Sequence, residues 1–410
     1  MAALKFPYLI RSIYSSEVSL SEQSSSSSGS WKHLLRSDEK GHVQSCSTSK
    51  FYKTKWFRVL AVLLVLGVLS SLIWVFLALG LPKRHTPNSP LNGVSSLVDD
   101  WKSPEDSMHL LSPWKADFTQ GINPIPCHSH NDYWRSVPLY KALAAGCTGV
   151  EADIYLPTEA GSKDLLVGHT SGSLTQTRTL ESLYTGPLIT ILDNLNNISD
   201  ISDGRASDWI GIFQSSPNTT LTLLLDFKSN GPELWPYVNE QLESLRSKGW
   251  LTHWNISSGI TWAPIIIVGT GNAPFDLLNS NNTYRDIFYD APLDDISNPI
   301  YDNTNSYYAS VSMARLGKQW LWKFSPAQLN KISAQIDAAS SKGLKARYWD
   351  TPVWSVTFRD YIWGILVEKG VGMLNVDVFS FYFILPVTDK IWSKPTCMKA
   401  ENVTERCDTS

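Results

Sequence analysis

Residues 59–81 form a run of 23 residues without a charged side chain, and this run constrains the fold more than any other feature. A helix of this length, rising about 1.5 Å per residue, crosses a hydrocarbon layer about 30 Å thick. The basic residues that closely precede the run are Lys40, Lys50, Lys53, Lys55 and Arg58. Only Lys83 and Arg84 follow it closely. Because basic flanks stay in the cytosol, we expect a transmembrane signal-anchor helix over 59–81 in a single-pass type II protein with a cytosolic N-terminus.

The segments on either side of the run have the composition of non-globular polypeptide. Ten of the sixteen residues in 15–30 are serine, which predicts a disordered, Ser-rich cytosolic tail over residues 1–58. Residues 82–119 begin with a stretch rich in Pro, Ser, Asn and Asp, so we expect a stalk or linker there. A globular pattern then extends over residues 120–395, which leaves residues 396–410 as a C-terminal tail.

The net charge of −3 combines two opposite contributions. Residues 1–58 carry nine basic and four acidic side chains, whereas the part after the apolar run carries 26 basic and 34 acidic ones. An acidic exported domain gives no reason to expect a nucleic-acid partner. Hydrophobic residues make up 43% of the chain, which is enough for a large core. The composition therefore indicates a globular domain behind a membrane anchor.

Five Asn-x-Ser/Thr sequons follow the apolar run, at Asn197, Asn218, Asn255, Asn281 and Asn402. Such sequons are acceptors for N-linked glycans in exported proteins. They agree with a luminal or extracellular location of the C-terminal part and predict a glycoprotein. The secretory pathway, the vacuole and the plasma membrane all fit this topology.

Short apolar runs alternate with amphipathic stretches through the globular region. Eight runs are predicted as strands: residues 122–127, 149–156, 221–227, 265–268, 287–289, 307–312, 345–349 and 372–376. Four stretches between them are predicted as helices: residues 139–145, 233–247, 326–341 and 361–368. Eight strands with intervening helices over about 270 residues predict the α/β class and a (β/α)₈ TIM barrel.

The barrel prediction bears on the cysteines. Cys127 is expected at the top of the first strand and Cys147 at the bottom, after the first helix. A helix between them would hold their Cα atoms beyond the ~7 Å limit for a disulfide, so no bridge is expected there. Cys397 and Cys407 flank a short polar segment and could pair in an oxidising lumen.

Four charged side chains lie on two of the predicted strands or directly after them. Glu151 and Asp153 are two residues apart on one strand, and Asp226 and Lys228 on another, so each pair points to one face. Three carboxylates that converge at a barrel mouth suit one hard divalent cation, Mg²⁺ or Ca²⁺. Lys228 cannot ligate a cation, but its ammonium group can hold a phosphate. The alternative is a structural salt-bridge network of the same four residues.

Three histidines, His128, His130 and His169, also fall at predicted strand ends. Imidazole titrates near neutral pH, so a pair of them can act as general base and general acid. His128 and His130 point to the same face, and we favour His130 because Asn131 and Asp132 follow it. A zinc site on the His-x-His pair is the alternative, although no further set of zinc ligands stands out in the sequence.

The order of these motifs resembles a known superfamily. His130-Asn-Asp, Glu151-Ala-Asp153, Gly168-His169 and Asp226-Phe-Lys228 are similar to motifs of glycerophosphodiester phosphodiesterase and phosphatidylinositol phospholipase C-like enzymes. The last motif also resembles that of sphingomyelinase D-type enzymes. Over roughly residues 120–395, the segments CHSHNDYWRSVPLYKAL, GCTGVEADIYL, LLVGH and RTLESLYTGPL resemble more closely the fungal altered inheritance of mitochondria protein 6 family.

The resemblance implies a TIM-barrel phosphoric diester hydrolase. It implies that the metal ligands are Glu151, Asp153 and Asp226, and that the acid/base pair is His130 and His169. It also implies that Lys228 contacts the substrate phosphate, and Asn131 and His128 are further candidates for that role. The expected substrate is a glycerophosphodiester or phospholipid, and the chain is expected to contact the lipid bilayer through residues 59–81.

Two positions depart from the superfamily. Glycerophosphodiesterases usually have arginine where this chain has Asn131, and glutamate where it has Asp226. Arg135 or Arg347 could replace the missing arginine. These departures keep open a catalytically weak or inactive barrel that binds lipid or glycan at the membrane. The 17 tryptophans keep open a glycoside hydrolase, which needs two opposed carboxylates and no histidines.

Overall fold

The computed structural model describes residues 48–84, 91–104, 109–159, 161–197, 209–319, 323–353 and 355–377. The predicted cytosolic tail before residue 48, the sequon at Asn402, the Cys397–Cys407 pair and the predicted C-terminal tail lie outside these residues. The chain divides into two compact units, residues 1–75 and residues 76–410.

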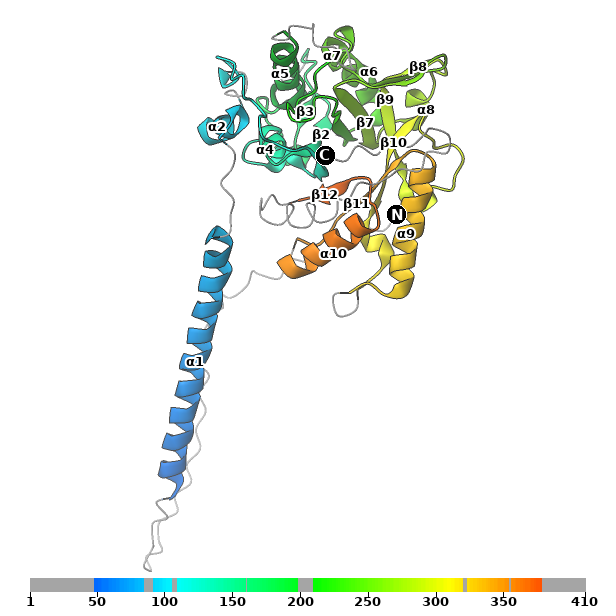
Figure 1. Ribbon diagram of the computed structural model, residues 1–410. Helices are drawn as coiled ribbons and strands as arrows, with labels where there is room; N and C mark the ends of the chain where they lie inside the picture. The colour runs from blue at the N-terminus through cyan, green and yellow to red at the C-terminus, as the bar shows by residue number, and fades with distance from the viewer. Residues whose placement is uncertain are drawn as a thin grey trace, which may run out of the picture. The chain divides into compact units, whose positions relative to one another are not determined.

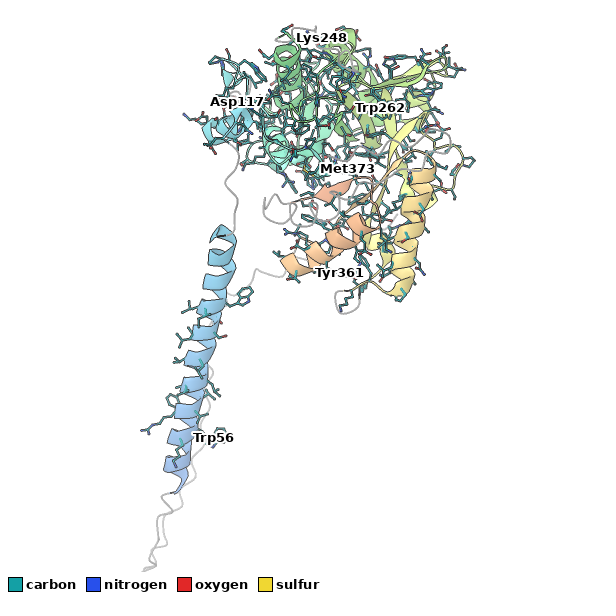
Figure 2. The ribbon with its side chains drawn as sticks, viewed as in Figure 1. Trp56, Asp117, Lys248, Trp262, Tyr361 and Met373 are labelled. Carbon is teal, nitrogen blue, oxygen red and sulfur yellow. A yellow bond between two sulfur atoms is a disulfide. The ribbon has the colours of Figure 1, made fainter. Side chains whose placement is uncertain are left out.

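Helix α1 (Thr48–Arg84) contains the apolar run that the sequence predicts as a membrane helix (Figure 1). Within it, Lys55–Val75 is long and apolar enough to cross a membrane, and no part of this span is buried. Large side chains such as Trp56 project from the helix (Figure 2). A helix that is apolar on all sides over this length is a candidate membrane anchor. Among the described residues, it is the one helix with this character.

Eight parallel strands form the wall of a nearly closed barrel (Figure 1). They are β1 (Ile125–Ser129), β2 (Cys147–Tyr155), β4 (Leu221–Phe227), β7 (Ile265–Gly271), β9 (Ile287–Pro292), β10 (Ser306–Ser312), β11 (Lys345–Trp349) and β12 (Leu374–Val376). Their order in space follows the chain, and β1 pairs with both β2 and β12. Met373 N donates a hydrogen bond of 3.1 Å to Ala346 O across the seam between β11 and β12. The eight predicted strands and the (β/α)₈ barrel are therefore confirmed.

Helices follow the strands and surround the barrel (Figure 1). They are α4 (Tyr140–Ala144), α5 (Gly186–Asn197), α6 (Gly231–Gln241), α7 (Glu243–Ser247), α8 (Phe275–Leu278), α9 (Pro326–Ser341) and α10 (Val356–Glu368). α9 begins at a capping box in which the side chains of Ser325 and Gln328 bond each other's backbone N–H groups. The predicted helix 233–247 is two helices, α6 and α7, which meet at Leu242.

The inside of the barrel has two layers. The lower layer is an apolar cluster that includes Leu224, Ile266, Val268, Phe288, Tyr308 and Met373. Above this layer the inward-facing positions are polar. On β2, Glu151 and Asp153 face the interior of the barrel, whereas the residues that alternate with them join the core beneath the helices. Polar side chains at the carboxyl ends of the strands therefore rest on an apolar floor, as in other barrels of this class.

Short elements complete the barrel unit. Strand β3 (Leu166–Val167) runs antiparallel to the end of β2 and so brings His169 back to the barrel mouth. A separate small sheet consists of β5 (His253–Asn255), β6 (Gly259–Thr261) and β8 (Tyr284–Arg285).

Part of the predicted stalk is packed on the barrel instead. Helix α2 (Gly93–Asp100) begins at Asn92, whose side-chain oxygen accepts a hydrogen bond of 3.0 Å from Ser95 N. Val94 and Leu97 on this helix belong to the main hydrophobic core, together with Phe118. The prediction of a stalk over 82–119 is therefore wrong for this part, because a few apolar residues in a polar segment suffice to dock one short helix.

Cys127 and Cys147 form a disulfide, with 4.7 Å between their Cα atoms. The sequence predicted no bridge here, and that prediction is wrong. β1 continues past Cys127 to Ser129, and β2 already begins at Cys147. Helix α4 between them has only five residues, so the chain returns to the neighbouring strand at the level of Cys127.

Candidate active site

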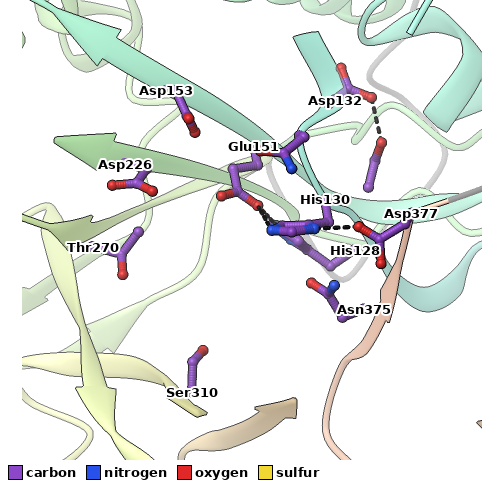
Figure 3. Close-up of polar contacts among 12 residues, drawn as sticks. His128, His130, Asp132, Glu151, Asp153, Asp226, Thr270, Ser310, Asn375 and Asp377 are labelled. Carbon is purple, nitrogen blue, oxygen red and sulfur yellow. Dashed lines mark hydrogen bonds and ion pairs between the residues drawn. The ribbon is translucent and has the colours of Figure 1, made fainter. Parts of the chain in front are cut away.

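The three carboxylates predicted as metal ligands meet at the carboxyl ends of β2 and β4. Asp153 and Asp226 are direct neighbours in the strand register, and Glu151 lies two residues before Asp153. One oxygen from each of the three lies within 4.8 Å of the others (Figure 3). Gly271 on the adjacent β7 has φ +66°, and a Cβ there would lie 2.0 Å from Asp226 Oδ1. The carboxylate of Asp226 therefore needs a glycine beside it.

Lys228 joins two of these carboxylates. Its Nζ lies 3.0 Å from Asp153 Oδ2 and also contacts Asp226 Oδ2. Burial and the neighbouring charges of Glu151 and Asp226 raise the pKa of Asp153 to about 7, in spite of Lys228. Burial likewise raises the pKa of Asp226. One lysine thus faces two carboxylates, Asp153 and Asp226, and the buried Asp153 Oδ1 has no hydrogen-bond partner among the described residues.

Glu151 is held by cationic and N–H groups from two other parts of the barrel, β1 with the residue that follows it and β11. His128 Nε2 lies 3.2 Å from Glu151 Oε2, Arg347 lies 3.5 Å away and His130 Nε2 lies 4.0 Å away. Burial alone would raise the pKa of Glu151, but the His128 hydrogen bond and the charges of His130 and Arg347 hold it well below its usual range. Glu151 is therefore ionised at neutral pH.

His128 and His130 face the same side of β1 but lie in different surroundings. His128 is fully buried, and burial and the charge of Arg347 lower its pKa to about 4, so its imidazole is neutral at pH 7. His130 lines the cavity, and its Nδ1 bonds Asp377 Oδ1 just past β12 (Figure 3). Burial would lower the pKa of His130, but the bond to Asp377 and the charge of Glu151 raise it above its usual value. His128, which the sequence predicts as a substrate contact, does not line the cavity, and its buried ring lies against Glu151 instead.

His169 approaches the carboxylates from the loop after β3. Its Nδ1 lies 3.0 Å from the Tyr133 hydroxyl and 3.5 Å from Asp153 Oδ2. The same hydroxyl lies 2.8 Å from Asp153 Oδ2. Trp134 lies against the imidazole, with ring centroids 4.4 Å apart. Tyr133 and Trp134 come from the short helix η1 (Asp132–Trp134), so the loop after β1 supports the histidine that follows β3.

A cavity of about 750 Å³ opens over this cluster. His130, His169, Glu151, Asp226, Lys228, Asn131, Arg347 and Asp377 contribute to its polar side. An apolar wall is formed by Trp349 at the end of β11 and by Pro352 and Val353 in the loop that follows it. A volume of this size accepts a small organic ligand, and the two contrasting walls suit a ligand with one anionic and one apolar part.

The sequence model of the AIM6-like phosphodiesterase domain family matches residues 116–290. The chain is 37% identical over 300 residues to an altered inheritance of mitochondria protein 6 homolog of Arthroderma benhamiae, across 71% of this chain and 90% of that protein. The chain belongs to this family. Altered inheritance of mitochondria protein 6 of Saccharomyces cerevisiae is also 37% identical, over 285 residues that cover 64% of this chain and 71% of the yeast protein. The solved structure of a glycerophosphodiester phosphodiesterase from Parabacteroides distasonis matches at 11% identity and a TM-score of 0.36, across 67% of this chain and 99% of that chain.

The matched AIM6-like phosphodiesterase domain ends at residue 290, before the cavity-lining residues Arg347, 349–353 and Asp377. Arg347 on β11 and Asp377 after β12 are supplied by the last quarter of the barrel. A complete cavity in this member of the altered inheritance of mitochondria protein 6 family therefore requires strands beyond the matched domain.

The two arginines proposed to replace the missing one have other partners. The Arg135 guanidinium donates to the carbonyl oxygens of His130 at 3.2 Å and Val376 at 2.9 Å, and so ties β1 to β12. Arg347 lines the cavity floor, where it donates to Ser310 Oγ at 3.0 Å and Asn375 Oδ1 at 3.1 Å besides its contact with Glu151. Asn131 lines the cavity with φ 48°, a left-handed conformation that asparagine tolerates well.

Sequence reasoning missed two groups of the site, Asp377 and Tyr133. Asp377 could have been found, because Asn375 and Asp377 repeat the two-residue spacing of Glu151 and Asp153 at the end of the last strand. Tyr133 carried no such signal. Its hydroxyl reaches Asp153 and His169 only because the loop after β1 folds over the barrel mouth.

Proposed function

We propose that this member of the altered inheritance of mitochondria protein 6 family is a metal-dependent phosphoric diester hydrolase acting on a glycerophosphodiester or phospholipid-type substrate. Its phosphodiesterase-type domain sets the reaction class. One observation carries the proposal: His130 and His169 line one cavity beside the carboxylate cluster, and each is oriented through its Nδ1. This is the arrangement that acid/base cleavage of a phosphate diester requires.

The carboxylate cluster fits one divalent cation, Mg²⁺ or Ca²⁺, held by Glu151, Asp153 and Asp226. The Oδ1 atom of Asp153 has no partner among the described residues, and burial together with the charge of Glu151 raises the pKa values of Asp153 and Asp226, so a bound cation would stabilise their ionised forms. Oxygen ligands from carboxylates suit these two metals. The cation would neutralise charge on the non-bridging oxygens of the phosphate.

His130 is assigned the role of general base. The carboxylate of Asp377 accepts the Nδ1 proton, which leaves Nε2 as the basic nitrogen on the cavity side. His130 takes a proton from the nucleophile, which is water or a neighbouring hydroxyl of the substrate. A new bond then forms between that oxygen and phosphorus.

His169 is assigned the role of general acid. As the bond between phosphorus and the leaving oxygen breaks, His169 gives its proton to that oxygen. The Tyr133 hydroxyl fixes the ring at Nδ1, and Trp134 supports one of its faces. His130 then releases its proton to solvent and His169 takes one up from solvent, so both residues return to their starting protonation states.

Lys228 and Asn131 are assigned to the phosphate. Two of the three N–H donors of Lys228 face Asp153 and Asp226, which leaves one for a substrate oxygen. Asn131 lines the same part of the cavity. His128 acts beneath them as a positioning residue, since its hydrogen bond holds Glu151.

An activity panel on the purified full-length chain in detergent tests the function. We expect hydrolysis of a glycerophosphodiester or a lysophospholipid that requires Mg²⁺ or Ca²⁺, and no cleavage of an aryl glycoside. Saturable binding of a diester without turnover would identify a binding module instead. Cleavage of the aryl glycoside would overturn the assignment, although three carboxylates gathered at one place do not resemble the opposed pair of a glycosidase.

We further propose a luminal or extracellular barrel anchored by α1, with a cytosolic N-terminus. The Cys127–Cys147 disulfide supports it, because such bonds persist in oxidising compartments. Asn281, in an exposed sequon on the small-sheet side of the barrel unit, is a suitable glycan acceptor. Endoglycosidase treatment of the protein from its native membrane is expected to increase its electrophoretic mobility, and Asn281→Gln to remove part of that shift. If the chain carries no glycan and added protease cleaves the barrel in intact vesicles, this topology is contradicted.

A further inference from the structure

The disulfide lies directly below the residues assigned to catalysis. Cys127 is the residue before His128, and Cys147 begins the strand that carries Glu151 and Asp153. Both cysteines are fully buried. The bond therefore joins the strand of the two histidines to the strand of two proposed metal ligands.

β1 contains one extra residue at the level of this bond. Ile125 pairs with Cys147 and His128 pairs with Gly149, so three steps along β1 match two steps along β2. A bulge of this kind decides which side chains face the barrel interior, because successive side chains alternate between the two faces. Without the extra residue, Cys127 would be the partner of Gly149 and His128 would point toward the helices.

The bulged register places His128 in an inward position that fits closely. Its Nε2 lies 3.2 Å from Glu151 Oε2, and a Cβ on residue 149 would lie 2.6 Å from its Nδ1. The imidazole of His128 therefore occupies the space that a side chain at position 149 would fill. His130 follows two residues later on the same face, so the register that aims His128 at Glu151 also aims His130 into the cavity.

We propose that the Cys127–Cys147 disulfide is a positioning device that holds the bulge of β1 in register, and so keeps His128 on Glu151 and His130 in the cavity. The regular strand pairing is interrupted between Ile125 and His128, and the covalent bond fixes the two strands to each other at this interruption. Cys127 and Cys147 are positioning residues, and the catalytic part of this inference rests on the function proposed for His130.

Removal of the bond in the full-length chain, in detergent, tests the inference. Cys127→Ala/Cys147→Ala deletes the disulfide, and Cys127→Val/Cys147→Ala deletes it while refilling part of the core. Cys397→Ala/Cys407→Ala is the matched control, because it removes two exported cysteines outside the described barrel. Circular dichroism first identifies a temperature at which each variant is folded. There we expect kcat to fall about 10–10²-fold in both disulfide-free variants, with KM little changed and the control equal to wild type.

A spectroscopic measurement separates positioning from a general loss of structure. The chain has eight histidines, so ¹⁵N-labelled histidine gives a simple spectrum, in which His128→Asn identifies the His128 signal. In wild type the buried N–H that bonds Glu151 is expected to exchange slowly with solvent, and in both folded disulfide-free variants to exchange fast. If neither variant folds, phosphine reduction of the wild-type chain at a low denaturant concentration, which lets the buried bond open transiently, followed by removal of the denaturant, gives the same comparison.

A slowly exchanging His128 proton in a folded chain that lacks the disulfide overturns the inference, whatever happens to kcat. A wild-type kcat in both folded variants overturns its catalytic part. If wild type hydrolyses no diester but the His128 proton still depends on the disulfide, the positioning inference stands and the proposed function fails.

Discussion

Replacing His130 or His169 with alanine is expected to lower kcat about 10²–10⁴-fold, which is the usual contribution of a positioned general acid or base. KM is expected to change much less, because Lys228 and Asn131 are the proposed phosphate contacts. Steady-state kinetics with the diester identified by the activity panel measures both. The double variant is expected to lose little more than the worse single variant, because the two residues act as a unit.

His253→Ala is the matched control for these substitutions. His253 lies on β5 of the small sheet, where its ring packs on Tyr284 at 5.2 Å between centroids, and it does not line the cavity. We expect a wild-type kcat for this variant. A wild-type rate in both His130→Ala and His169→Ala would remove the acid/base assignment.

The pH profile tests which histidine is the base. A base must be deprotonated, so kcat/KM falls as the pH drops through the pKa of His130. Burial would lower that pKa, but Asp377 and Glu151 raise it above the ordinary value of about 6.5. Asp377→Asn removes part of this effect, so the acidic limb is expected to move to lower pH. If the acidic limb does not move, it reports the titration of a group other than His130.

The barrel was predictable because its strands are short apolar runs at regular spacing, and their carboxyl ends must lie at one face. That rule brings Glu151, Asp153 and Asp226 together from segments about 75 residues apart along the chain, as the structure places them. Alternation also put His128 and His130 on one face. It could not separate them, because the difference lies in depth: one ring is beneath the cavity and the other lines it.

The disulfide and α2 were not predictable by these rules. The bridge depends on where β1 ends and where β2 begins, and a shift of two residues in each reverses the conclusion. The bulge in β1 includes Pro126, which has no N–H for the ladder, but a proline alone does not show that the strand gains one residue there. α2 has eight residues in a polar segment, and its few apolar residues, Val94 and Leu97, do not show in the sequence that it docks beside α4.

The cation is expected to bind the wild-type chain and to bind Asp153→Asn at least about tenfold more weakly, since even outer partners of metal ligands contribute about 10–100-fold to affinity. Isothermal titration with Mg²⁺ and with Ca²⁺ measures this without any substrate. Chelation is expected to abolish hydrolysis, and added cation to restore it. Asp294→Asn, which removes a surface carboxylate paired with Arg315, is the control and should bind like wild type.

The pH dependence of this binding decides between a metal site and a salt-bridge network. Asp153 must be ionised to ligate a cation, and its pKa lies at about 7, so wild-type affinity should rise between pH 6 and pH 8 with release of a proton. In Asp153→Asn that slope is expected to disappear along with most of the affinity. If Glu151, Asp153, Asp226 and Lys228 form only a salt-bridge network, wild type will show no binding heat for either metal at any pH. Asp153→Asn would then change the free energy of unfolding alone, because it would weaken the contacts of Asp153 with Lys228, Tyr133 and His169 without removing a metal ligand.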